Sequence, residues 1–353
     1  MSLWLLVYAI TFHPADVQAA ELQCPAETPE LSLNQTVRVL NWNVQYMGSK
    51  NNVFWYDLPI NMSAEEKAKY TTVDYPSQSD ITSTLDEVAR VIKDENPDLV
   101  MLQEVDQNSG RTHNVDQVAE LQQRLGGAYP CQSEAYYWKA SFVPHPNIAT
   151  SVGMKLLTLS KYKIESATRH QLPLIPQSWL QQQFNLKRAV LESRLPVKNG
   201  TPFVALNTHL SAFSQGSDTM EKQIAKLNSL LQGLDKEKLN WILGGDFNLL
   251  PPGISNKMVH PTAEAYYNEV SEIEPLFASY ASVFTTKELQ GPDRARYFSY
   301  LSNSPLVEEM DRTIDYIFHA RSVVVKGGRV RQKDTQKISD HMPLIADFSL
   351  TKP

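Results

Sequence analysis

The pattern that organises the chain is a short apolar run that ends in polar residues. In residues 241–248 such a run passes through two glycines to Asp246 and Asn248. A run of this length bounded by glycine predicts a buried strand, and residues two apart on a strand point to the same side. Asp246 and Asn248 are therefore expected to meet at the end of that strand.

Three further runs have the same form. They occupy residues 37–43, 99–104 and 203–209, and they end in Asn41 and Asn43, in Glu104, and in Asn207 and His209. One polar residue after a strand is typical of a turn, but four such runs are hard to explain that way. Because ligands of α/β proteins bind at the carboxyl ends of strands, we predict one shared polar site. The Ser-Asp-His sequence at 339–341 is expected to contribute to it.

The order of the other elements predicts the fold class. Helices are predicted at 80–96, 114–125 and 217–234, and further strands at 153–160, 188–195, 313–319, 322–331 and 343–350. Helices alternate with strands early in the chain, whereas strands follow one another in the middle and at the end. This order favours an α/β (α+β) protein with two packed sheets flanked by helices over one doubly wound sheet. No change of composition divides residues 37–353, which are predicted to form one domain.

Three long segments, at 44–78, 134–150 and 251–305, have no clear periodicity. We interpret the first two as aromatic loops and leave the third unassigned. Long loops in compact domains are often functional. The aromatic residues of 44–78 can equally pack under their own loop, and both interpretations remain open.

Charge narrows the class of partner. The chain has 353 residues, 42% of them apolar, and a formal net charge of −6. No block or tail of Lys and Arg marks a nucleic-acid surface. The negative net charge argues against tight binding of DNA, although a local basic groove would still be compatible with a nuclease.

The N-terminus has the form of an export signal. Residues 3–12 are apolar, and small residues at 17–19 suit a signal peptidase, although no Lys or Arg precedes Arg38. We predict a cleaved signal peptide at 1–19, a linker at 20–36 and a secreted or periplasmic protein; the alternatives are an uncleaved N-terminal anchor or a stray apolar arm. The two cysteines, Cys24 and Cys131, can pair after export or remain free, and the sequence leaves this open.

The candidate site is rich in hard oxygen ligands. They belong to Glu104, Asp246, Asp315, Asp340, Asn43 and Asn248. This set suits Mg²⁺ or Mn²⁺ and not Zn²⁺. His209 and His341 are the strong candidates for proton transfer near neutral pH, so the pattern indicates metal-assisted hydrolysis of a phosphate ester. A phosphate-binding G-x-x-x-x-G-K-[ST] loop and a G-x-S-x-G elbow are both missing from the sequence, which argues against NTP-driven and serine-esterase chemistry.

The chain resembles the endonuclease/exonuclease/phosphatase superfamily, which has the deoxyribonuclease I-like fold. The matching segments occur in the family's order and span nearly the whole chain after the signal peptide. They are LNWNV at 40–44, PDLVMLQEV at 97–105, LTLSKYKI at 157–164, NTHL at 207–210, GGDFNLLP at 244–251, DRTIDYIF at 311–318 and SDHMPL at 339–344.

The resemblance implies a four-layer α/β/β/α sandwich and a metal-dependent phosphodiesterase. It implies that Asn43, Glu104 and Asp340 hold the metal, Mg²⁺ or Mn²⁺. The implied catalytic roles are those of Asp246 for the attacking water, Asn248 and His209 for contacts to the scissile phosphate, His341 beside that phosphate, and Asp315 to orient His341.

The substrate is less constrained than the reaction. A histidine at the position of His209 resembles the deoxyribonuclease I, sphingomyelinase and inositol-phosphatase branches of the family, whereas apurinic endonucleases usually carry Tyr at this position. The expected substrate is a phosphodiester in a nucleic acid or, alternatively, in a lipid head group. We expect a monomer without a protein partner. A catalytically silent binding module of the same fold is the less favoured alternative, because every matched catalytic position is filled.

Overall fold

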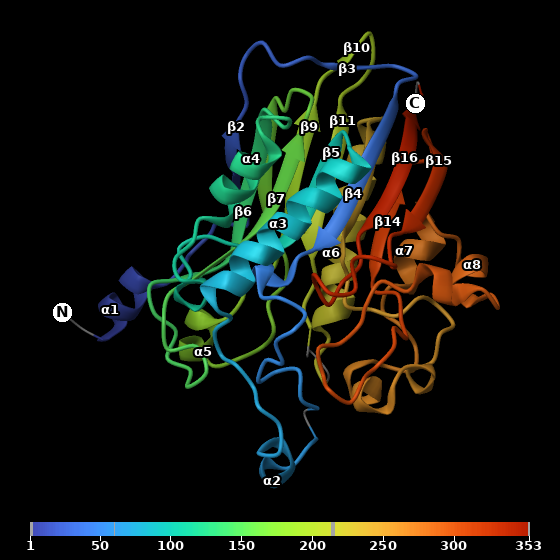
Figure 1. Cartoon of the computed structure of the whole chain (residues 1–353). Helices are drawn as coiled ribbons and strands as arrows, with labels where there is room; N and C mark the ends of the chain where they lie inside the picture. The colour runs from blue at the N-terminus through green and yellow to red at the C-terminus, as the bar shows by residue number, and fades with distance from the viewer. Residues whose placement is uncertain (1–2, 60, 213–215, 352–353) are drawn as a thin grey trace.

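Two mixed β-sheets packed face to face form the centre of the computed structural model, which describes residues 3–59, 61–212 and 216–351 (Figure 1). In spatial order, the first sheet consists of β15 (Val323–Val330), β16 (Leu344–Leu350), β4 (Thr36–Asn43), β5 (Leu99–Asp106), β7 (Val152–Ser160), β6 (Cys131–Ala140) and β2 (Glu21–Gln23). The second sheet consists of β1 (Val17–Ala19), β8 (Ser166–Gln171), β9 (Ala189–Leu195), β11 (Phe203–His209), β12 (Asn240–Asp246), β14 (Asp315–His319) and β13 (Ala281–Ser282). A short parallel pair joins β10 (Val197–Lys198) and β3 (Leu31–Ser32).

The helices are mostly short. They are α1 (Leu3–Ile10), α2 (Ala64–Lys67), α3 (Gln78–Glu95), α4 (Gln117–Leu125), α5 (Trp179–Phe184), α6 (Thr219–Lys236), α7 (Glu274–Ser279) and α8 (Thr286–Gln290). Single 3₁₀ turns occupy Gln45–Met47, Gly110–Thr112, Asn256–Met258, Pro261–Tyr266 and Arg294–Tyr297. In the part of the chain that the structure describes, every helix is too short or too polar to cross a lipid bilayer.

The alternation of side chains along the central strands sets the order of the layers. On β4, Val37 and Val39 join the large apolar cluster that includes the second sheet, whereas Leu40 and Trp42 pack with the apolar face of α3. On the far side, the Trp241 indole N–H of β12 donates to the Asp235 carboxylate of α6 at 2.8 Å. Helices α3 and α4 thus cover the first sheet and α6 the second, which confirms the predicted α/β/β/α sandwich (Figure 1).

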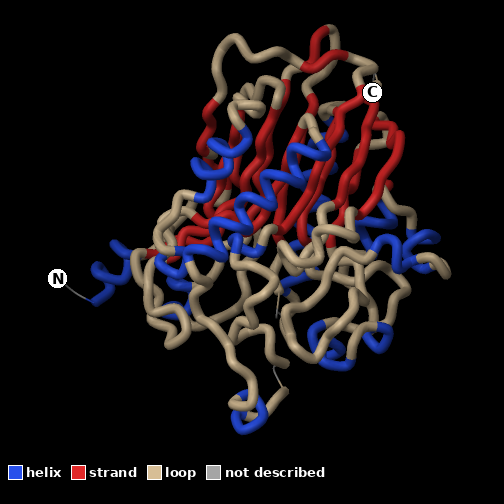
Figure 2. The backbone as a smooth tube through the Cα atoms, viewed as in Figure 1, coloured by secondary structure: helices blue, strands red, loops and turns tan. Residues whose placement is uncertain are grey.

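Most of the irregular chain gathers at one end of the sandwich (Figure 2). Strand β4 pairs in parallel with β5, and β11 pairs in parallel with β12. Strands β4 and β12 both finish at this end, because Asn43 at the end of β4 hydrogen-bonds to Asp246 at the end of β12. The ends of strands from both sheets are therefore available to one site, as the sequence pattern predicts.

One predicted loop is wrong over its first half. Tyr136, Tyr137 and Trp138 lie in β6, within the segment 134–150 that we interpret from sequence as an aromatic loop. Aromatic residues favour strands, but nearly every position of β6 is buried. The strand therefore lacks the alternation of polar and apolar residues that would identify it in the sequence.

The N-terminal segment is ordered against the body. Within the predicted linker at 20–36, β2 pairs with β6 and β3 pairs with β10. Strand β1, which ends at Ala19, pairs with β8 at the edge of the second sheet. Met1 and Ser2 of the predicted signal peptide lie outside the described residues.

A disulfide joins Cys24 and Cys131, two residues whose pairing the sequence leaves open. Cys24 directly follows β2 and Cys131 begins β6, so the bond fastens the N-terminal segment to the edge of the first sheet. Glu21 of β2 adds an ion pair to the buried Lys155 of β7, with 3.0 Å between Oε2 and Nζ. Both contacts hold β2 in place.

Replacing both Cys24 and Cys131 with alanine should lower the free energy of unfolding by about 2–5 kcal/mol, because the disulfide restricts the unfolded chain over a long loop. Urea unfolding followed by tryptophan fluorescence measures the loss. Dithiothreitol should produce a similar loss in the wild type and no further loss in the double variant. Two thiols that titrate readily in the native wild type would contradict the assignment.

Candidate active site

Strand register brings three of the predicted residues side by side in the second sheet. His209 of β11 is paired with Asp246 of β12, and Asp246 is paired with Asp315 of β14. All three lie at strand ends, and all three are almost fully buried. Residues more than 100 positions apart in the sequence thus form one edge of the site.

The first sheet supplies the opposite edge. Asn43 ends β4 next to Gln103 of β5, and Glu104 follows at an irregularity where the pairing of β5 with β7 shifts register. Glu104 has φ +58°, and Asn248 beyond the end of β12 has φ +52°. Left-handed backbone is costly for a residue with a side chain, and such strain concentrates at functional sites.

Buried amides join the two sheets directly beneath the site. Gln103 donates through Nε2 to Asn41 Oδ1 at 2.9 Å and to Asn207 Oδ1 at 2.8 Å. Asn207 donates to the main-chain carbonyl groups of Leu102 and Leu157 at 3.1 and 3.0 Å. These three amides connect strands of both sheets, so Asn41 and Asn207 act as links between sheets.

Two glycines allow the sheets and strands to approach. A Cβ atom on Gly244 would lie 2.4 Å from the Met101 side chain of the first sheet, and one on Gly245 would lie 2.0 Å from the Thr208 carbonyl oxygen. The Thr208 oxygen belongs to the main chain and cannot move aside, whereas the Met101 contact is with the terminal methyl group of a flexible side chain. Gly245 is therefore required for close packing at the position where the site is built.

Asp246 is the point on which the site converges. Its Oδ2 lies 2.9 Å from Asn43 Nδ2, 3.2 Å from His209 Nε2 and 3.4 Å from His341 Nε2. Its Oδ1 accepts the backbone N–H of Asn248 at 2.9 Å. Burial is the main reason that the pKa of Asp246 rises to about 7. A carboxylate with this pKa can exchange a proton near neutral pH.

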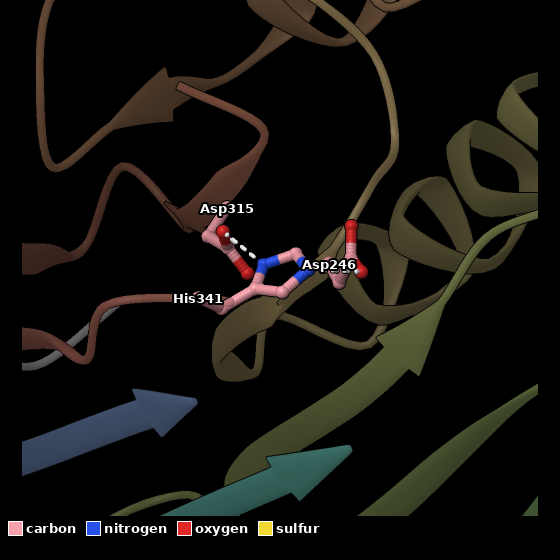
Figure 3. A group of neighbouring side chains, drawn as sticks. All are labelled: Asp246, Asp315 and His341. Atoms are coloured by element: carbon pink, nitrogen blue, oxygen red, sulfur yellow. Dashed lines mark hydrogen bonds and ion pairs between the residues drawn. The ribbon is translucent and has the colours of Figure 1, made fainter. Parts of the chain in front are cut away.

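His341 lies between Asp246 and Asp315 (Figure 3). Its Nδ1 hydrogen-bonds to Asp315 Oδ2 at 2.8 Å, and the Ser299 hydroxyl donates to the same oxygen at 2.7 Å. Burial alone would lower the pKa of His341, but the charges of Asp315, Asp246 and Asp340 outweigh burial and raise it well above its usual range. His341 is therefore a fixed, positively charged donor.

His209 has the opposite protonation preference. Burial, with the charges of Arg188 and His341 acting in the same direction, lowers its pKa well below the usual range. Its Nδ1 lies 3.3 Å from the Tyr137 hydroxyl, and its Nε2 lies 3.2 Å from Asn248 Nδ2. The site thus holds one neutral and one charged imidazole, which can play different parts in one reaction.

Two carboxylates and an amide form a donor set of hard oxygens. Burial, and then the charge of Asp340, raise the pKa of Glu104, and burial also raises the pKa of Asp340. Asn43 Nδ2 lies 3.3 Å from Glu104 Oε1, while Asn43 Oδ1 accepts the backbone N–H of Gln45 at 3.0 Å. Ligation of a metal through Oδ1 would therefore require the Asn43 amide group to turn.

A second acidic group overlaps this set. Potential ligand atoms of Asp246, Asp315 and His341 lie within 4.8 Å of one another, and all three residues are buried. The hydrogen bond from His341 Nδ1 to Asp315 already uses one atom from each of these two side chains. This group is better suited to orient His341 than to surround an ion.

A cavity of about 250 Å³ opens onto the site. Six of the eight predicted residues line it, namely Glu104, His209, Asp246, Asn248, Asp340 and His341. The other two, Asn43 and Asp315, lie behind the lining and hydrogen-bond to residues in it. The structure therefore brings all eight predicted residues together.

The long segments contribute unequally to the cavity wall. Segment 44–78 supplies Tyr46 and Tyr56, and segment 251–305 supplies Tyr266, Tyr267 and Tyr300. No residue of 134–150 is part of the described lining. The first aromatic segment both lines the cavity and packs inward, because Phe54 and Tyr46 are also buried in an apolar cluster with residues of β6 and β7.

Sequence reasoning misses two residues beside the catalytic group. Tyr137 accepts the Glu104 backbone N–H at 3.1 Å, and Arg188 lines the cavity with its guanidinium 5.1 Å from the Tyr137 ring centre. Tyr137 lies in β6, within the segment that we interpret from sequence as a loop. Arg188 immediately precedes β9 outside every matching segment, and its sequence carries no signal that distinguishes it from a surface arginine.

Comparison with known proteins identifies the family. The sequence profile of the Endonuclease/Exonuclease/phosphatase family matches residues 40–341. No curated protein matches at a significant level. Among solved structures, an endonuclease/exonuclease/phosphatase from Beutenbergia cavernae is similar with a TM-score of 0.58 and 20% identity, covering 90% of this chain and 72% of that one.

Two further structures support the same fold. An endonuclease/exonuclease/phosphatase from Bacteroides vulgatus has a TM-score of 0.54 and 17% identity over 90% of this chain and 99% of that one. The human nocturnin catalytic domain has a TM-score of 0.54 and 18% identity over 94% of this chain and 97% of that one. The family match and the fold together show that this chain belongs to the endonuclease/exonuclease/phosphatase family and is a hydrolase of phosphate ester bonds.

Proposed function

We propose that the protein is a Mg²⁺-dependent phosphodiesterase that uses Asp246 to activate water. The observation that carries the proposal is the convergence on Asp246 Oδ2 of Asn43, His209 and His341, at 2.9, 3.2 and 3.4 Å. These side chains come from four separate segments of both sheets. A carboxylate held among two imidazoles and an amide is suited to take a proton from water beside a phosphate.

The donor set fits a hard divalent cation. Asp340 is buried and Glu104 is partly buried, and the two carboxylates act on each other as like charges, which is costly without a cation. With Asn43 they offer oxygen ligands of the type that Mg²⁺ prefers. When bound, the ion supplies charge neutralisation for the phosphoryl oxygens.

The remaining steps follow from the protein's own side chains. Asp246 accepts a proton from the attacking water. Charged His341, oriented by Asp315, donates a hydrogen bond to the phosphoryl group, while Asn248 and neutral His209 hold its oxygens. Preorganised donors of this kind act without reorganisation during the reaction.

We propose a phosphodiester substrate in nucleic acid or, alternatively, in a lipid head group. Tyr56 and Tyr267 line the cavity and are partly exposed, so they offer faces on which a base can stack. We also propose that the protein acts as a monomer. A substrate panel of DNA, RNA, sphingomyelin and phosphoinositides distinguishes these classes.

Hydrolysis of bis-p-nitrophenyl phosphate should require Mg²⁺ or Mn²⁺ and should stop in EDTA. Asp246→Asn should lower kcat/KM by about 10³-fold, because the water loses its base. A p-nitrophenol absorbance assay measures both effects.

Asp347→Asn is the matched control for this experiment. Asp347 is also a sheet carboxylate with a fixed partner, Arg38, at 2.7 Å, but it lies outside the cavity lining. It should leave kcat/KM within about twofold of the wild type. Full activity of Asp246→Asn, or hydrolysis that survives EDTA, would contradict the proposed mechanism.

Strain at Glu104 provides an independent test of its role. Both Glu104→Ala and Glu104→Gly should abolish metal-dependent hydrolysis. Because glycine accepts the positive φ at this position, Glu104→Gly should be more stable than Glu104→Ala by about 0.5–1 kcal/mol. Chemical unfolding curves measure the difference.

The control pair lies in a helix. Glu87 is exposed in α3, where glycine costs about 1 kcal/mol relative to alanine. Glu87→Gly should therefore be the less stable member of its pair. The same order at Glu104 would contradict functional strain at that residue.

We also propose that the protein is exported and cleaved after Ala19. The Cys24–Cys131 disulfide supports an oxidising compartment. Strand β1 is an edge strand paired only with β8 among the described strands, so its removal leaves the remaining sheet intact.

Mass spectrometry of protein recovered from a secreting host should find an N-terminus at Ala20. Recovery of only the uncut chain from the cytoplasm would contradict export.

A further inference from the structure

Three arginines line the cavity, and two of them already have an acidic partner. Arg111 donates to both carboxylate oxygens of Asp106, at 2.9 and 3.0 Å. Arg312 forms an ion pair with Asp311 at 2.8 Å. The positive charges of Arg111 and Arg312 are therefore largely balanced within the protein.

Arg188 differs from both. Its side chain lines the cavity, the residue is only 8% exposed, and its Nη1 is buried without a hydrogen-bonding partner among the described residues. No acidic residue of the described chain forms an ion pair with it. The guanidinium lies over the face of the Tyr137 ring, 5.1 Å from the ring centre. A buried guanidinium without an anionic partner is costly, so this position calls for a functional explanation.

The position of Tyr137 relates Arg188 to the reacting groups. The Tyr137 hydroxyl accepts the Glu104 backbone N–H at 3.1 Å and lies 3.3 Å from His209 Nδ1. Arg188 lies on the ring face of the same tyrosine. Its charge therefore lies on the side of the cavity where Glu104 and His209 meet.

We propose that Arg188 binds a non-bridging oxygen of the scissile phosphate. The inference rests on the proposed phosphodiesterase activity and adds a residue to it. A guanidinium is permanently charged, and its planar fork matches two phosphate oxygens. The charge of a phosphodiester resides on its non-bridging oxygens, and Arg188 is the arginine of the described lining that forms no ion pair with a carboxylate.

The test compares Arg188→Gln and Arg188→Lys with Arg194→Gln. Arg194 lies in the adjoining strand β9, pairs with Glu192 and Glu237, and is not part of the cavity lining. With bis-p-nitrophenyl phosphate and Mg²⁺, kcat/KM of Arg188→Gln should fall about 10²-fold, because kcat falls and KM rises. Arg188→Lys keeps the charge but not the fork and should lose about tenfold. Arg194→Gln should stay within twofold of the wild type.

A second measurement does not depend on turnover. Calorimetric titration with inorganic phosphate in Mg²⁺ should show affinity reduced at least tenfold in Arg188→Gln and unchanged in Arg194→Gln. The thermal midpoint of Arg188→Gln should equal or exceed that of the wild type, because a buried unpaired charge is removed. If this variant does not fold, Arg188→Lys replaces it in both measurements with the tenfold losses expected above.

The outcomes separate the inference from the proposed function. Wild-type kinetics and wild-type phosphate affinity in Arg188→Gln overturn the inference while leaving the phosphodiesterase proposal in place. A wild type that hydrolyses no diester overturns the proposed function, and the phosphate titration then decides the inference alone.

Aryl diesters with different leaving groups add a final check. A loss that increases as the leaving group becomes poorer places Arg188 at the leaving oxygen and overturns the non-bridging contact.

Discussion

The site depends on the buried amide contacts that hold the two sheets together. Gln103 donates to Asn41 and Asn207, and Asn207 donates to main-chain carbonyl groups of the first sheet. An amide buried without partners is costly, so a slip of one sheet past the other would break these bonds at once. The hydrogen bonds therefore fix the relative position of the sheets. That position brings Asn43 of one sheet within 2.9 Å of Asp246 of the other.

The residues above this layer carry several unfavourable features at once. Buried carboxylates act on one another, Glu104 and Asn248 have positive φ, and Arg188 lacks an anionic partner. Positive φ also occurs elsewhere in the described chain, for example at Asn34, Asn96 and Asn199. What distinguishes the cavity is that like charges, strained backbone and an arginine without an anionic partner meet there, as is typical of functional sites.

Much of the site is predictable from the sequence because its residues end apolar strands. The two-residue spacing of Asp246 and Asn248 identifies a strand end without knowledge of the fold, and the family motifs assign partners to it. Tyr137 and Arg188 escape this reasoning for different reasons. Tyr137 lies in a strand buried on both faces, where alternation is lost. Arg188 matters because other elements leave it unpaired, and pairing is a property of the folded structure. The same is true of the amide links, which appear in the sequence as ordinary polar residues.

The charged groups of the site and the aromatic wall of its cavity come from different parts of the chain. Most of the acidic and imidazole groups come from strand ends, whose positions the sheets fix, while Asp340 and His341 lie in the turn just before β16. The tyrosines of the cavity wall come from segments 44–78 and 251–305, which contain few strand residues and so can vary without disturbing the sheets. Tyr300 connects the two parts, because its ring packs edge-on against His341 with 4.9 Å between ring centres. A change in the wall at this residue would disturb the His341 imidazole as well, so the wall can vary independently of the charged groups only away from that contact.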